Sequence, residues 1–277
     1  MPELPHKDMD AYSLKEKGNT FYKMGYFNTA EAFYSQAILK HDREPTFYTN
    51  RAMARTKQDQ FQSASVDCQT SIKLGGPSVK ANYLLSQCLL ALRDFDGALE
   101  NALVAHRLGV ATGDKSLPNL TRQVLCCKKD RWSEREKNRS REGQELENQL
   151  IALLQQEYET SLMRCQGDAE RVAVSEELDS KLKTLSATFE AARAASEKKR
   201  EIPDWAIDDI TFGIMVDPVV TRTGKSYERA SILQALEQNG IDPLSRQPLH
   251  PRDLRPNLGL RQACEEFLEQ NGWAADW

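Results

Sequence analysis

Small and apolar residues recur every 34 positions through the first third of the chain. Ala30, Ala64 and Ala98 are evenly spaced at this period. Turn-forming residues recur at a similar distance and should end the first helix of each unit. Small residues recur with the same period at two further slots: Gly18, Ala52 and Ser86 at one, and Ala37, Ser71 and Ala105 at the other. The turn residues are Gly25, Asp59-Gln60 and Arg93-Asp94. The pattern predicts stacked helix–turn–helix units whose helices cross closely at the small residues.

A 34-residue period with small residues at fixed slots is typical of tetratricopeptide (TPR) repeats. We therefore predict a TPR domain over residues 11–112 with three repeats, at 11–44, 45–78 and 79–112, and a capping helix region over 113–131. Such a stack leaves a concave groove lined by the first helix of each repeat.

Two lysines and two amides fall at groove-facing slots of this stack. Lys15 and Asn19 lie four residues apart in the first repeat and so share a helix face. Asn50 occupies the second repeat, and Lys80 and Tyr83 occupy the third. Converging ammonium and amide groups suit a peptide's terminal carboxylate and its acidic neighbours. For any single lysine, the alternative is an ordinary solvated helix face.

Together these residues resemble the carboxylate clamp of co-chaperone TPR domains. The resemblance implies binding of the C-terminal Glu-Glu-Val-Asp tail of the seventy-kilodalton and ninety-kilodalton heat-shock chaperones. It also implies that Tyr83 helps to form a pocket for an apolar peptide residue, and that an aspartate beyond the third repeat completes the clamp. Asp114 is the nearest candidate for that aspartate.

Residues 132–200 are highly charged and carry two apolar stripes, separated by Gln166-Gly167-Asp168. Heptad-like spacing of this kind predicts two helices that form an antiparallel hairpin. The stripes are Leu146, Leu150, Leu154, Tyr158 and Leu162, and then Leu178, Leu182, Leu185, Phe189 and Ala192. A lone charged hairpin buries little, so we expect it to form a two-fold dimer with a second copy. Packing on its own TPR domain is the alternative.

Residues 203–277 predict a small domain in the order loop, hairpin, helix, loop, helix. A zinc-held RING domain has loops in this order, yet Cys264 and His250 are the only Cys and His in the segment. A structural zinc site normally needs four such ligands. The segment resembles the U-box, the RING scaffold whose metal sites are replaced by polar and apolar contacts, so no zinc or other cofactor is expected. The side chains available for those contacts are Asp217, Lys225, Glu228 and Arg246.

By this resemblance, the domain holds a ubiquitin-conjugating enzyme charged with ubiquitin and forms no covalent intermediate itself. Ile210, Phe212 and Ile214 of the first loop, with Pro243 of the second, would form the apolar groove for the conjugating enzyme. Arg246 matches the arginine that holds the charged ubiquitin in a reactive pose. The alternative is that the apolar residues belong to the core and that Arg246 forms a surface ion pair.

Taken together, the chain resembles the CHIP family of co-chaperone ubiquitin ligases. The expected fold is mainly α: TPR repeats, a dimerising helical hairpin and a small α+β U-box. The resemblance implies an E3 ubiquitin ligase that docks on chaperones and ubiquitinates them and their misfolded clients. A non-catalytic chaperone adaptor is the alternative, and an RNA-processing scaffold with a U-box is a weaker one.

Charge and hydropathy limit the partners and the location. The net charge of −4 and pI of about 5.7 argue against a basic nucleic-acid binder. No apolar run approaches the roughly 20 residues that span a membrane, and the first residues lack a secretory signal pattern. We therefore expect a cytoplasmic protein, with the nucleus as a further possible location.

Overall fold

The computed structural model describes residues 10–196 and 201–276. By its internal contacts the chain divides into two compact units. One unit comprises the chain up to Trp132 together with the chain from Trp205 onward, and the other is Ser133–Asp204. Within the described residues, no helix is both long enough and apolar enough to cross a membrane.

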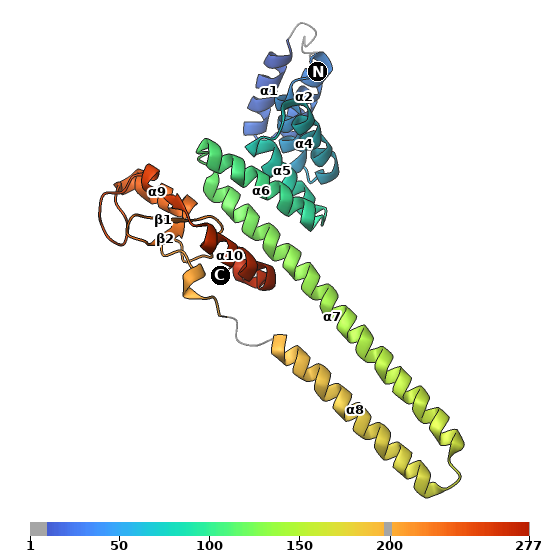
Figure 1. Cartoon of the computed structure of the whole chain (residues 1–277). Coiled ribbons are helices and arrows are strands. Elements are labelled where there is room, and N and C mark those ends of the chain that lie inside the picture. The colour runs from blue at the N-terminus through green and yellow to red at the C-terminus, as the bar shows by residue number, and fades with distance from the viewer. Residues whose placement is uncertain (1–9, 197–200, 277) are drawn as a thin grey trace. The chain divides into compact units, whose positions relative to one another are not determined.

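Six helices in antiparallel pairs form the predicted repeats (Figure 1). Each pair matches one repeat, and each helix also packs on the next pair. The bounds are α1 Ala11–Lys23, α2 Phe27–Lys40, α3 Pro45–Thr56, α4 Phe61–Gly75, α5 Val79–Ala91 and α6 Phe95–Thr112.

The turn inside each repeat has one conformation, which recurs once per repeat. Gly25, Asp59 and Arg93 each adopt a positive φ, at 83°, 58° and 64°. In each turn the following N–H donates to the carbonyl four residues before the turn residue, at 2.9–3.0 Å. This left-handed C-cap bond ends a helix cleanly. The predicted inner turns are therefore confirmed, although only the first uses the glycine that this conformation favours.

The small residues at the repeat slots lie in the core, as predicted. Ala30, Ala64 and Ala98 have no exposed surface, because neighbouring helices cross at these positions. Tyr34 packs so close to Gly18 that an added Cβ would lie 2.5 Å from its ring. Glycine is therefore required there for the contact between α1 and α2.

One long helix, α7 (Leu117–Arg164), follows the repeats. Its first turns cover α6, with Val124 and Cys127 in a cluster with Ala98, Leu99 and Ala102. The predicted boundary between capping helix and hairpin, at 131/132, falls inside this helix, because the local sequence contains no glycine or proline to end it there.

In the second unit, the rest of α7 pairs with α8 (Asp168–Ser196) as an antiparallel hairpin (Figure 1). Lys181 reaches Glu157 across the pair at 3.5 Å and also bonds Glu177 at 2.9 Å. Most stripe leucines are half-buried, and Leu146 is 51% exposed. The final predicted hairpin residues, 197–200, lie outside the described residues.

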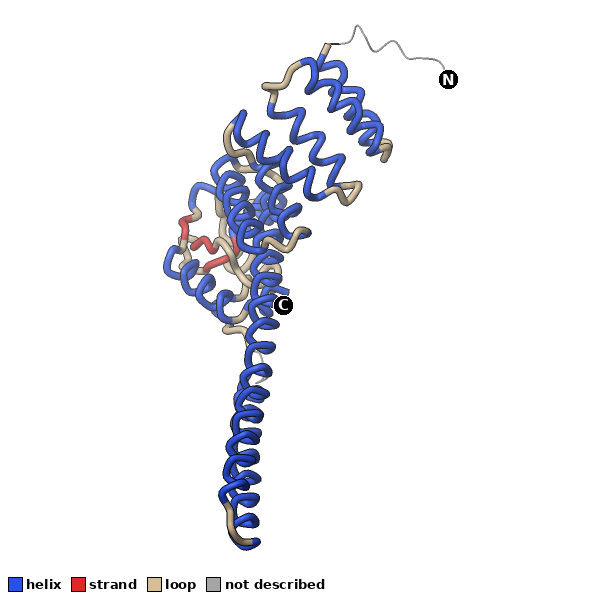
Figure 2. The backbone as a smooth tube through the Cα atoms, turned by 90° about the vertical axis from the view of Figure 1, so that its right-hand side faces the viewer, coloured by secondary structure: helices blue, strands red, loops and turns tan. Residues whose placement is uncertain are grey.

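The C-terminal domain has the predicted order of elements around three short strands, which gather in one small sheet (Figure 2). The sheet order is β2-β1-β3, all antiparallel, with Val219 opposite Tyr227. The elements are η1 Asp204–Ala206, β1 Pro218–Val220, β2 Ser226–Glu228, α9 Arg229–Asn239, η2 Pro251–Asp253, β3 Arg255–Pro256, α10 Leu258–Gln270 and η3 Gly272–Asp276.

Within the first unit, the C-terminal domain packs on α6 and on the start of α7. The Trp132 indole N–H donates to the carbonyl of Gln270 at 3.1 Å, and Arg131 pairs with Glu269. A Cβ on Gly272 would overlap the Trp132 side chain, so a glycine is needed at this contact. Val216, next to β1, packs on the apolar cluster of α6 and α7.

Candidate functional site

Three of the predicted groove residues, Asn19, Asn50 and Lys80, form one hydrogen-bonded chain across three helices. The Lys80 ammonium on α5 donates to the Asn50 side-chain oxygen on α3 at 2.9 Å. The Asn50 amide donates to the Asn19 oxygen on α1 at 3.3 Å. That oxygen also accepts from the Tyr34 hydroxyl at 2.9 Å. The helical stack thus brings together polar residues that are far apart in sequence and fixes their orientation.

Positive charge in this groove is only partly balanced. Lys15 pairs with exposed Glu16 on its own helix at 2.7 Å. Lys80 has a neutral amide as its hydrogen-bond partner, and both desolvation in the groove and the charge of Lys15 lower its pKa. A bound carboxylate would offset the repulsion between the Lys15 and Lys80 ammonium groups. The groove therefore favours an acidic ligand.

The remaining two predicted groove residues differ in their placement. Tyr83 is half-buried on α5, three residues after Lys80, where it can flank a ligand. Asp114 instead belongs to the turn between α6 and α7. Its carboxylate accepts from the Ser116 N–H at 2.8 Å and from the Ser116 hydroxyl at 2.7 Å. It also lines a separate cavity with Arg122 and Glu237, so the structure does not join it to the chain at Lys80.

In the C-terminal domain, two loops at 207–214 and 241–248 share one backbone design. The ends of each loop form an antiparallel bridge, Ile207 to Ile214 and Ile241 to Pro248. The second residue of each loop bonds the sixth and seventh through its main chain, at 2.8–2.9 Å. The sixth residue has a positive φ in both loops, at 57° and 56°.

The second residue of each loop is a buried aspartate. In the first loop, Asp208 accepts from the Thr211 N–H at 3.0 Å and from its hydroxyl at 2.7 Å. Its other oxygen accepts from the Glu228 N–H at 2.9 Å. One carboxylate thus closes the loop and fastens it to β2.

Asp242 does the same in the second loop. It accepts from the N–H groups of Leu244 and Ser245 at 2.9 and 3.3 Å, and from the buried Tyr227 hydroxyl at 2.8 Å. A longer bond, 3.3 Å, comes from the Thr223 hydroxyl. Burial acts to raise the pKa of Asp242, but these donors outweigh burial and hold the pKa below its usual value.

Two further carboxylates hold the chain between the first loop and the sheet. Glu228 accepts from the N–H groups of Val216 and Asp217, both at 2.8 Å. Burial raises the pKa of Glu228 to about 7, and its second oxygen has no partner among the described residues. Asp217 bonds Arg229 at 2.6 Å and also pairs with Arg261 on α10.

The two loops present apolar and cationic groups to solvent. Phe212 is 70% exposed and Leu244 is 66% exposed. Pro243 and Arg246 are also exposed, and the side chain of Arg246 makes no hydrogen bond or ion pair with any described residue. Exposed large apolar side chains together with an uncommitted guanidinium are typical of a binding face.

The other two predicted contact residues lie deeper. Ile210 is half-buried against the core cluster of Val219 and Tyr227. Ile214 is only 4% exposed and supports the base of the first loop. Its predicted place on a partner-binding surface is at odds with this burial, because the bridge with Ile207 turns the end of the loop inward.

The sequence analysis named four polar side chains that could make the contacts of the U-box loops. It missed Asp208 and Asp242, the two aspartates at the centre of those loops. A signal for them exists in the sequence. "IDDITFGI" and "IDPLSRQP" both begin with Ile-Asp and have the same length. Of the residues that were named, Lys225 forms a surface pair with Asp209, and Arg246 does not join the loops. Within the described residues, no group of three or more His, Cys, Asp or Glu side chains is placed to hold a metal ion.

Comparison with known proteins identifies both parts of this arrangement. Residues 202–273 match the U-box domain family. The E3 ubiquitin-protein ligase CHIP of Arabidopsis thaliana is 32% identical over 268 residues, which cover 95% of each chain. The chain belongs to the CHIP family of U-box ubiquitin ligases. It is therefore an E3 ubiquitin ligase with a TPR domain, and the two aspartate-centred loops are the loops of its U-box.

Two further matches each cover only one part of the chain. Tetratricopeptide repeat protein 12 of Mus musculus is 37% identical over 90 residues, covering 32% of this chain and 13% of that protein. Among solved structures, the second TPR of Spaghetti (RPAP3) bound to an HSP90 peptide is 28% identical, with a TM-score of 0.36. It covers 36% of this chain and 93% of that one.

Proposed function

We propose that this CHIP-family ligase uses its TPR groove to bind the acidic C-terminal tails of the seventy-kilodalton and ninety-kilodalton heat-shock chaperones. The observation that carries the proposal is the pairing of Lys15 and Lys80 in one groove. Lys80 is bonded to a neutral amide, and no carboxylate of a described residue pairs with it. A terminal carboxylate with acidic neighbours supplies that missing charge, and the Asn19 and Asn50 amides add directional bonds.

We further propose that Phe212, Pro243 and half-buried Ile210 bind a ubiquitin-conjugating enzyme, and that Leu244 extends this surface. Arg246 would hold the charged ubiquitin, since its donors are uncommitted among the described residues and a positive φ directs its position in the loop. Cys264, the only cysteine of the U-box, is 1% exposed. Ubiquitin would therefore pass directly from the conjugating enzyme to chaperones and their misfolded clients, without an intermediate on this chain.

A homodimer through the helical hairpin completes the proposal. Between residues 133 and 192, the described side chains include no fully buried apolar residue. A hairpin of this length gains little hydrophobic stabilisation alone, and a second copy would cover the stripe. Because the proposed chaperones are cytosolic, the cytoplasm is the proposed location.

Two assays on the full chain test the two surfaces separately. The first assay measures discharge of ubiquitin from a panel of charged conjugating enzymes to free lysine. The second measures ubiquitination of a chaperone that ends in Glu-Glu-Val-Asp. Phe212→Ala should abolish both activities, whereas Lys80→Ala should retain discharge and lose chaperone ubiquitination.

Matched controls use residues of similar exposure outside the two surfaces. Leu258→Ala, at a 67% exposed leucine that begins α10, should retain both activities, as should Lys73→Ala on α4. Unchanged chaperone ubiquitination by Lys80→Ala would remove the groove from the proposal. No discharge from any conjugating enzyme would favour an adaptor that binds chaperones without transferring ubiquitin.

A further inference from the structure

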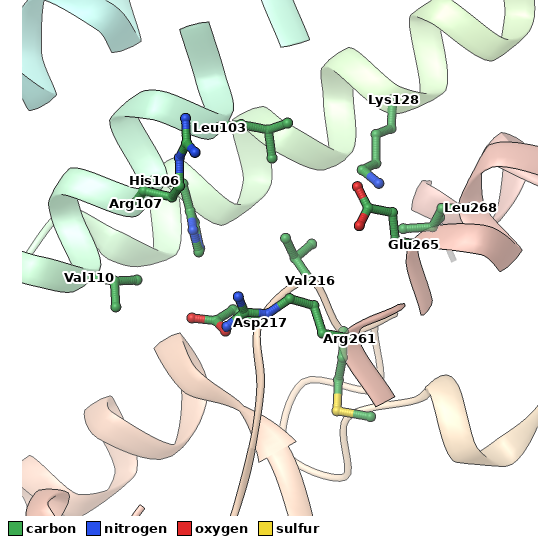
Figure 3. Close-up of a pocket in the computed structure, with 11 residues that line it drawn as sticks. Leu103, His106, Arg107, Val110, Lys128, Val216, Asp217, Arg261, Glu265 and Leu268 are labelled. Atoms are coloured by element: carbon green, nitrogen blue, oxygen red, sulfur yellow. The ribbon is translucent and has the colours of Figure 1, made fainter. Parts of the chain in front are cut away.

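A cavity of about 210 Å³ lies inside the first unit, and none of its lining residues belongs to the groove chain or to the loops at 207–214 and 241–248. Helices α6, α7 and α10 and the segment before β1 all contribute to its wall (Figure 3). Its apolar lining is Leu103, Val110, Met215, Val216 and Leu268. This volume is below the roughly 300–1,000 Å³ of pockets for drug-sized ligands. An occupant must therefore be small and largely apolar.

One buried charged group in this wall makes no direct hydrogen bond or ion pair with a described residue. Lys128 on α7 is only 6% exposed, and it forms no hydrogen bond or ion pair with any of them. A buried ammonium without a counter-ion is costly, and burial lowers the pKa of Lys128 accordingly. Figure 3 shows its side chain extending from α7 toward Glu265. Glu265, which is exposed, and Glu269 both attract Lys128 without reaching ion-pair distance, and Glu269 is already paired with Arg131.

The other charged groups of the wall do not satisfy Lys128. The Asp217 carboxylate is already bonded to both Arg229 and Arg261. Arg261 has an unsatisfied hydrogen-bond donor in the same wall, since its Nε is buried without an acceptor in the part of the chain that the structure describes. His106 shares a hydrogen bond of 3.2 Å with Thr121, and burial lowers its pKa, which favours the neutral ring.

Three cationic side chains that line this wall or bond to it are matched by two carboxylates. The cations are Lys128, Arg261 and Arg229, which shares Asp217 with Arg261, and the carboxylates are Asp217 and Glu265. The wall thus lacks one negative charge, and the unpaired cation lies against an apolar lining. A phosphate or other multiply charged anion would over-compensate this charge and would leave the apolar lining uncovered.

We propose that this cavity binds a small monocarboxylate with an apolar tail, and that Lys128 is its counter-ion. The carboxylate pairs with the Lys128 ammonium, with the Arg261 Nε as a second donor within the same wall. The tail covers Leu103, Val110, Val216 and Leu268. Because the wall comes from both the repeat helices and the U-box, the ligand joins the two parts of this unit.

Methyl NMR on the full chain, labelled at Leu and Val methyl groups, tests the proposal directly. Sodium hexanoate is titrated at constant ionic strength, with hexanol and hexylammonium as probes of equal length. We expect hexanoate to shift the methyl signals of Leu103, Val110, Val216 and Leu268. Hexanol and hexylammonium should bind at least tenfold more weakly. Equal affinity for hexanol, or no shift of these signals by hexanoate, would overturn the proposal.

Variants separate the cavity from the groove. Lys128→Met should weaken hexanoate binding at least tenfold, whereas Lys183→Met, at an exposed lysine of α8, should leave it unchanged. Glu265→Gln should strengthen binding, because it removes the competing carboxylate. Lys15→Ala should have no effect, which shows that the site is distinct from the chaperone groove. Unchanged binding by Lys128→Met contradicts the proposal, and the comparison of probes on the unmodified chain stands even if that variant folds poorly.

A peptide C-terminus could supply the same chemistry as a free acid. N-acetyl-leucine stands in for a peptide C-terminus, and its amide, which lacks the carboxylate, is the matched control. The small cavity favours the free acid, so N-acetyl-leucine should bind no more tightly than hexanoate. Tenfold tighter binding of N-acetyl-leucine, lost in the amide, would overturn the free acid as the ligand and assign the site to a peptide terminus.

Discussion

Asp208 and Asp242 occupy the same position in two loops of equal length, and each is bonded to one of two adjacent residues in β2. Asp208 accepts from the Glu228 N–H, and Asp242 accepts from the Tyr227 hydroxyl. A single strand therefore holds both loops of the U-box. In each loop, a buried carboxylate that accepts three or more hydrogen bonds holds the chain together.

Removing the charge of Asp242 should destabilise the U-box. Asp242→Asn weakens charge-assisted bonds from two backbone N–H groups and a buried hydroxyl, so we expect a loss of about 1.5–3 kcal/mol in the free energy of unfolding. Tyr227→Phe should cost about 1–2 kcal/mol, because it removes one of these donors. Hydrogen exchange of the amides of Leu244 and Ser245, measured in the full chain, reports the local loss.

The matched control is Asp209→Asn, which alters the carboxylate next to Asp208. Asp209 is exposed and forms a surface pair with Lys225. Pairs of this kind contribute about 0–1 kcal/mol, so the control should change exchange little. Equal effects of Asp209→Asn and Asp242→Asn would contradict the central role of the buried carboxylate.

The stability of the U-box should also depend on pH through Glu228. The pKa of Glu228 is raised to about 7 in the folded chain, against an ordinary value of 4.5. Between these values the folded chain binds the proton more tightly than the unfolded chain, so the free energy of unfolding falls as pH rises. The difference corresponds to a loss of about 3 kcal/mol once pH exceeds 7.

Glu228→Gln removes this ionisation and keeps an oxygen for the N–H groups of Val216 and Asp217. The variant should therefore be more stable than the parent at pH 8, and the difference should shrink toward pH 5. Urea unfolding from pH 5 to 8 measures this difference in stability, with Glu237→Gln, at an exposed position of the helix α9 that follows Glu228, as the control. A parent and variant with parallel pH curves would show that Glu228 stays ionised throughout.

Much of the fold could be predicted from the sequence, because its signals are local and repeated. The regular spacing of small residues located the helix pairs, and the turns at Gly25, Asp59 and Arg93 followed from it. The boundary predicted at 131/132 lies within one residue of the division between the two compact units, but α7 runs through it without a break, since no residue there stops the helix. A change in composition, such as the charged segment after Trp132, alters what covers a helix without ending it.

The candidate site residues divide in the same way. Lys15, Asn19, Asn50 and Lys80 could be assigned from repeat slots, because the stack converts equal spacing into a shared groove. The burial of Ile214 could not be predicted from the sequence. Alternation of apolar residues along a loop does not show which of them the bridge that closes the loop turns inward. The Tyr227 hydroxyl that donates to Asp242 comes from another element of the domain, and only the tertiary fold brings the two together.

Affinity for acidic peptides should depend on both lysines of the groove and on salt. Lys80→Ala should cost about 1.5–3 kcal/mol, at least tenfold in affinity for a peptide ending in Glu-Glu-Val-Asp, and Lys15→Ala should cost a similar amount. Affinity should also fall as salt screens these charges. Calorimetry at low and at moderate salt measures both effects. The amidated peptide and Lys73→Ala are the controls, and salt-independent binding would exclude a charge-based clamp.

The helical hairpin should carry the dimer contact along its apolar stripe. Leu146 belongs to that stripe and is 51% exposed in the single chain, so Leu146→Glu should leave the hairpin folded. In a dimer the same change places an unpaired charge in an apolar interface, which should weaken association by several kcal/mol. Sedimentation across a range of concentrations should show monomers for Leu146→Glu, with unchanged helicity by circular dichroism. Gln156→Glu adds the same charge at an exposed position of the same helix and should remain dimeric. If the parent chain itself sediments as a monomer, the stripe must instead be covered within one chain.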